Sequence, residues 1–74
     1  MSLRLTQLPP GQLARVVEVR SSDPARLNRL GAYGLMPGSV LRLEQRRPTL
    51  IFRLGETEVA IDEAVGGQIM VEPI

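Results

Sequence analysis

The stretch GLMPGS, residues 34–39, carries the strongest local structural signal in this chain. Pro37 has the φ angle that the first central position of a type II turn requires, and Gly38 accepts the positive φ of the second. Gly34 suits the left-handed residue that ends many helices. The stretch therefore predicts a helix that ends near Gly34 and a tight turn that leads into a new element.

The residues before this stretch predict a short helix. Asp23 is a good N-cap, and Pro24 suits the first helical position. Leu27 and Leu30 are three residues apart and therefore share one face of the helix. Gly31 weakens a helix by up to ~1 kcal/mol relative to alanine, so we expect that close backbone packing requires a glycine there.

Most of the remaining chain predicts β-strands, because apolar and polar residues alternate over short runs. The expected strands span residues 12–20, 39–46, 49–54, 57–61 and 68–72. The adjacent Val16 and Val17 break the alternation in the first strand, which indicates either a bulge or a strong bend. Gly55-Glu56 fits a two-residue type II′ hairpin. Residues 62–65 predict one turn of helix that Gly66-Gly67 ends.

These elements predict a mainly β protein with about five strands and one short helix between the first and second strands. At 74 residues, the chain has room for a single domain, residues 1–74. One helix of about ten residues covers too little of such a sheet, so we expect the sheet to curl into a small, partly open barrel. An open barrel edge with few charges would allow a weak homodimer to form by strand pairing.

Composition excludes several classes of function. The chain contains no cysteine and no histidine, which removes disulfides, thiolate chemistry and histidine-based acid–base or metal sites. The one adjacent carboxylate pair, Asp62-Glu63, is typical of a helix start. We therefore predict no catalytic residue, no metal site and no cofactor.

Charge and hydropathy give two further expectations. A formal net charge of +1 is too small for phosphate attraction to dominate binding, so direct nucleic-acid contact is not expected. No run reaches the about 18 apolar residues that span a bilayer, and the N-terminus lacks a signal-peptide pattern. A cytoplasmic location is the default expectation.

Candidate docking residues lie around the turn and on the strands that follow it. Leu35 and Met36 are either core residues or an exposed docking knob. The core is favoured for Leu35, whereas Met36 is open to both interpretations. Arginines on neighbouring strands would form a basic patch, although the stacking aromatics of nucleic-acid platforms are nearly absent. The candidates for partner docking are Leu35, Met36, Arg42, Arg46 and Arg47.

Several motifs occur in an order that resembles the FeoA family, from about Leu8 to Val71. They are Leu8-Pro9-x-Gly11, Arg29-Leu30, Gly34-Leu35-x-Pro37-Gly38-Ser39, Val59-Ala60-Ile61-Asp62 and Ile69-x-Val71. The resemblance implies an SH3-like barrel and a role in bacterial ferrous iron uptake. It also implies that the protein acts on FeoB, a membrane transporter with a GTPase domain. The resemblance implies no catalytic or metal-binding residue.

A second setting remains open, because related domains occur at the C-terminus of DtxR-type metal-dependent repressors. The 45–48 loop and the 55–57 hairpin resemble that subgroup. There the barrel is a regulatory module that would contact the winged-helix and dimerisation domains of the same chain. The sequence therefore favours an adaptor that binds FeoB, with the repressor domain as the alternative and direct metal or nucleic-acid binding as a third hypothesis.

Overall fold

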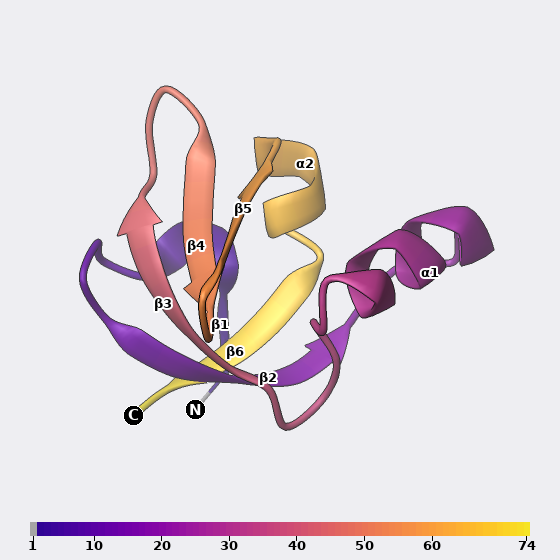
Figure 1. Cartoon of the computed structure of the whole chain (residues 1–74), viewed down its shortest axis with the longest axis horizontal. Helices are drawn as coiled ribbons and strands as arrows, with labels where there is room; N and C mark the ends of the chain where they lie inside the picture. Colours follow the sequence, from indigo (N-terminus) through magenta and orange to yellow (C-terminus); the bar gives the residue numbers. More distant parts are fainter. Residues whose placement is uncertain (1) are drawn as a thin grey trace.

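The computed structural model describes residues 2–74, and a strongly curved antiparallel sheet dominates it (Figure 1). The strands lie in the order β1-β6-β2-β3-β4-β5. Within the described residues, the edge strands β1 and β5 do not pair with each other, so the barrel is open. The elements are β1 (Leu3–Arg4), the 3-10 turn η1 (Leu5–Gln7), β2 (Leu13–Val19), α1 (Pro24–Ala32), β3 (Val40–Gln45), β4 (Leu50–Leu54), β5 (Thr57–Ile61), α2 (Glu63–Gly66) and β6 (Ile69–Pro73).

The expected mainly β, partly open barrel is confirmed, and its six strands are one more than the about five expected. The N-terminal segment adds β1, which pairs with β6 through Leu3 and Val71. The helix α1 consequently follows the second strand of the chain and not the first. A two-residue strand is too short for an alternating pattern, so only its pairing with β6, near the other end of the described residues, reveals it. Leu5, the first residue of η1, and Leu8, the residue that follows η1, are both fully buried.

The predicted turn at Gly34, Pro37 and Gly38 is confirmed. Gly34 has a φ of 90°, and the N–H of Leu35 donates to the carbonyl of Leu30 at 3.0 Å, which is the pattern of a Schellman cap. Gly38 has a φ of 95°, and the N–H of Ser39 donates to the carbonyl of Met36 at 2.9 Å. These values define the type II turn.

The irregularity in the first long strand is a β-bulge. Val16 pairs with Val71, but the next pair is Glu18 with Met70, so Val17 is the extra residue. The bulge reverses the inward and outward alternation beyond it. Val16 is buried before the bulge, and Val19 packs against the core after it.

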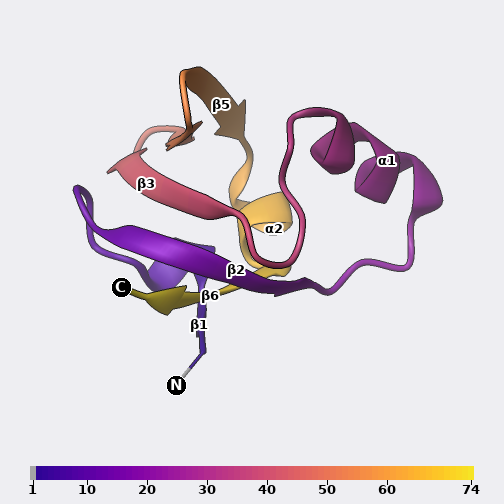
Figure 2. The ribbon, with the colours of Figure 1, turned by 60° about the horizontal axis from the view of Figure 1, so that its bottom comes forward.

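The hydrophobic core fills the concave side of the sheet and draws residues from every strand except the two-residue β1. Phe52, on β4, is fully buried and is the one aromatic side chain in the core. Leu30 is the one buried residue of α1, which lies off one side of the sheet in both views (Figures 1 and 2). The cluster contains Leu5, Leu8, Ala14, Val16, Leu30, Leu35, Leu41, Leu43, Leu50, Phe52, Val59, Ile69 and Val71.

The expectation that Gly31 is required for close packing is wrong. A β-carbon built at Gly31 would have no atom within 4 Å apart from its own helix and chain neighbours. We therefore expect Gly31→Ala to raise the free energy of unfolding by about 0.5–1 kcal/mol, because alanine loses less backbone entropy in a helix. Thermal melting measures this. Gly34→Ala is the matched control and should lower the melting temperature, because Gly34 has a positive φ; equal effects at the two positions would contradict this account.

Candidate docking surface

The turn after α1 separates the two apolar docking candidates. Leu35 is 2% exposed and packs in the core, so its side chain is not available to a partner. Met36 is 51% exposed on the rigid turn. The hydroxyl of Ser39 donates to the carbonyl of Gly34 at 2.7 Å, and the N–H of Gly38 donates to the carbonyl of Val16 at 2.8 Å. The first bond closes the turn, and the second ties it to β2.

The arginine candidates lie far from Met36. Met36 precedes β3, and Arg46 and Arg47 follow it, so the strand separates them by about 20 Å at ~3.3 Å per residue. In Figure 1 the turn lies at the bottom of the molecule, and the loop between β3 and β4 lies at the top. Arg42 lies between them on the outer face of β3, where it is exposed. The structure therefore does not bring the five predicted residues into one patch.

Carboxylates offset the expected basic patch. Arg42 pairs across the sheet with Arg53. The Arg53 guanidinium, however, donates from Nε to Glu44 at 3.0 Å and from Nη2 to Glu58 at 3.2 Å. All three partners are partly or largely exposed, so each pair contributes little to stability. Their main effect is to neutralise positive charge on the outer face of the sheet, which weakens that face as an anion-binding surface.

A groove that was not predicted from the sequence lies between α1 and the end of β5. We call it the α1–β5 groove; it has a volume of about 250 Å³. One wall is a single helix face at the spacing i, i+3, i+4 and i+7, and the other is formed by β5 and α2. The lining residues are Arg26, Arg29, Leu30 and Tyr33, with Ala60, Ile61, Asp62 and Val65 opposite them.

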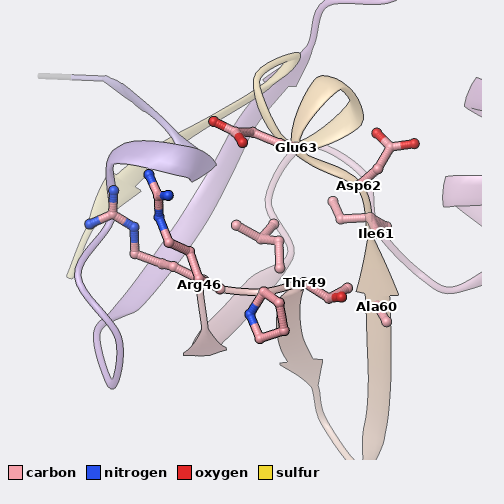
Figure 3. A pocket seen from close by; sticks show the side chains of 9 residues that line it. Arg46, Thr49, Ala60, Ile61, Asp62 and Glu63 are labelled. Atoms are coloured by element: carbon pink, nitrogen blue, oxygen red, sulfur yellow. The ribbon is translucent and has the colours of Figure 1, made fainter.

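A second, larger groove lies on the other side of the β5 end, between the β3–β4 loop and α2 (Figure 3). Its volume is about 470 Å³, and it shares Ala60, Ile61 and Asp62 with the first groove. Arg46 and Glu63 lie on opposite sides of it (Figure 3). The end of β5 therefore stands between two open grooves, both of which carry arginines.

Asp62, which follows β5 directly, has a structural role. Oδ1 of Asp62 accepts a hydrogen bond from the N–H of Val65 at 2.8 Å, which is the N-cap predicted for α2. Across residues 2–74, no group of three acidic side chains lies close enough together to hold a metal ion. In the same residues, no helix has the length and apolar character needed to cross a bilayer.

An open, strongly curved six-stranded sheet with a helix beside it and two shallow grooves is an SH3-like β module. The model of the FeoA domain matches residues 3–73, nearly the whole chain. This chain belongs to the FeoA domain family.

Solved structures of FeoA proteins, of IdeR and of a manganese-dependent transcriptional repressor share the fold. An iron uptake regulatory protein (FeoA) is 24% identical with a TM-score of 0.88, and the match covers 100% of this chain and 99% of that one. The FeoA protein from Chlorobium tepidum is 23% identical with a TM-score of 0.89, over 97% of this chain and 70% of that one. T. acidophilum IdeR is 25% identical with a TM-score of 0.91, but this chain spans 34% of its length. No curated protein matches the sequence.

Proposed function

We propose that residues 1–74 work in the cytoplasm as a single non-catalytic binding domain in ferrous iron uptake, which docks onto the cytoplasmic part of the FeoB transporter and modulates it. Membership of the FeoA family is the observation that carries this proposal. The likeness to solved FeoA proteins over the whole of this chain supports it.

The surface of the domain also supports an interaction function. Three large apolar side chains are more than one third exposed on α1 and in the turn that follows it: Leu27, Tyr33 and Met36. The type II turn holds the backbone of Met36 rigid, so docking there would cost little conformational entropy. Methionine and tyrosine are residues that protein interfaces favour.

A direct binding measurement tests the proposal. The purified domain and the cytoplasmic part of FeoB from the same organism should form a complex in a pull-down and in calorimetry at tens of micromolar. Met36→Ala should weaken this complex, because an exposed thioether that fills a partner pocket is lost, whereas Ile74→Ala, at the C-terminal end of the chain, serves as the control. The absence of any complex at that concentration would reject the proposal.

The likeness to IdeR favours a second function, that of a regulatory domain of a metal-dependent repressor, contacting its winged-helix and dimerisation domains. The gene distinguishes the two: a reading frame that continues upstream through a winged helix would establish the repressor setting. Calorimetry with ferrous, manganous and zinc ions and a salt-dependent DNA shift assay test the third hypothesis, direct metal or nucleic-acid binding.

A further inference from the structure

The edge of β5 has backbone groups that no strand uses. β5 pairs with β4 on one side, and it is the last strand of the sheet on the other. The Gly55-Glu56 turn, in which Gly55 has a φ of 57°, makes Leu54 and Thr57 a hydrogen-bonded pair. Hydrogen-bonded and non-hydrogen-bonded pairs alternate along an antiparallel ladder. Glu58 and Ala60 are therefore non-hydrogen-bonded partners of β4, and their N–H and C=O groups point toward the free edge.

This edge opens into the α1–β5 groove, where one face of α1 stands opposite the end of the strand. Ala60 is exposed and lines this groove as well as the larger one beside it. Ile61 and Val65 are partly buried and supply an apolar floor. A segment that pairs with β5 would thus meet unsatisfied backbone groups, an apolar floor and a helix wall at the same time.

The charges that surround this end of β5 are mostly positive. Arg26 and Arg29 lie on the α1 wall, and Arg46 and Arg47 line the groove on the other side. Among residues 2–74, none of these four guanidiniums forms an ion pair. Nη1 of Arg26 donates one hydrogen bond to Gln68 at 2.7 Å. Asp62 and Glu63 are the carboxylates that line the two grooves, so the four arginines outnumber them and the balance of charge favours a negatively charged occupant.

We propose that the partner contributes an extended acidic segment that adds as a strand to the free edge of β5. This proposal rests on the proposed function. Its backbone pairs with Glu58 and Ala60, and its alternate side chains divide between two environments. Apolar side chains lie over Ile61 and Val65, and carboxylates reach Arg26 and Arg29. Strand addition of this kind obtains affinity from main-chain hydrogen bonds and specificity from alternate side chains.

A proline at position 60 tests the edge in the complex with the cytoplasmic part of FeoB. Ala60→Pro removes the N–H that points toward the groove without removing a hydrogen bond of the β4–β5 ladder. It should weaken the complex about tenfold, since the bond to the partner is lost. Ala60→Val changes the same groove-lining position but keeps the N–H, so it should weaken the complex clearly less than Ala60→Pro. Equal affinities of both variants and the unchanged domain would overturn the edge proposal while the proposed function stood.

A charge reversal tests the helix wall. Arg26→Glu with Arg29→Glu should weaken the complex about tenfold or more, and added salt should no longer weaken the remaining binding, because the reversed charges repel an acidic segment and salt screens that repulsion. Arg4→Glu with Arg15→Glu makes the same change in net charge on β1 and β2, away from the groove, and should have little effect. An equal loss in the two double variants would indicate non-specific attraction and overturn the assignment of the acidic segment to this groove.

A peptide experiment keeps the edge proposal testable if FeoB does not bind. The probes are the blocked peptide Thr-Val-Glu-Val-Asp-Val-Thr, its analogue with lysine at both acidic positions, and a short single-stranded oligothymidylate. In spectra of the ¹⁵N-labelled domain, the acidic peptide at millimolar concentration should shift the amides of Glu58 and Ala60, and the lysine peptide should not. No shift with the acidic peptide, or shifts at these amides with the oligonucleotide alone, would overturn the proposal.

Discussion

Replacing Phe52 by alanine is expected to lower the free energy of unfolding by about 3–5 kcal/mol. Phe52 is fully buried in β4, and it pairs with Leu43 on β3 and with Val59 on β5. All three side chains belong to the core. Removal of the ring leaves a cavity that the surrounding aliphatic side chains fill only in part. A domain of this size has a total stability of roughly 4–11 kcal/mol, so this one change removes a large part of it.

Tyr33 gives this prediction a matched control, because it is the other aromatic residue of the chain and is 43% exposed. Tyr33→Ala should change stability by less than about 1 kcal/mol. Urea denaturation of the two variants and the unchanged domain measures both values, provided that the m-values agree. Comparable losses at the two positions would show that Phe52 does not anchor the core.

Replacing Gly38 by valine is expected to destabilise the fold by more than ~1 kcal/mol. Its φ of 95° lies in the region that β-branched residues rarely adopt. The space around it is open, since a β-carbon would have no atom within 4 Å apart from its chain neighbours. The loss therefore comes from the backbone conformation and not from a collision.

Asparagine distinguishes this mechanism from a general intolerance of side chains at position 38. It adopts positive φ more readily than other non-glycine residues, so Gly38→Asn should lose clearly less stability than Gly38→Val. Thermal melting ranks the three proteins. A melting temperature of Gly38→Val equal to that of the unchanged domain would contradict the type II turn.

Local signals in the sequence were sufficient to predict most of the fold. Asp23, Gly34 and Gly38 act on their own neighbours, so helix start, helix end and turn could be read directly from the chain. The bulge at Val17 was one of two alternatives, because only the partner strand β6 shows which residue lacks a partner. The N-terminal strand could not be predicted, because its two residues acquire strand structure solely by pairing with β6.

The candidate site was less predictable, since a docking surface depends on tertiary neighbours. The sequence left Met36 open to a core or a surface position, and only the folded structure shows that its side chain is exposed. The helix face that contains Arg26 and Tyr33 has regular spacing, and this was a usable signal. This spacing could not predict the opposite wall of the groove, because Ala60 comes from a strand distant in the sequence.

The position of β6 in the sheet has a consequence for how the protein is made. This last strand lies between β1 and β2, the first two. As the chain leaves the ribosome, β2 through β5 can pair in order. Leu3 and Val16 find their partner on β6, and the core is filled on the concave side, only once Ile69 to Val71 have been made. Contacts between such distant segments slow folding, and the exposed apolar surface favours aggregation in the meantime. We therefore expect folding to be completed only after synthesis has passed β6, in one late step that joins both ends of the domain.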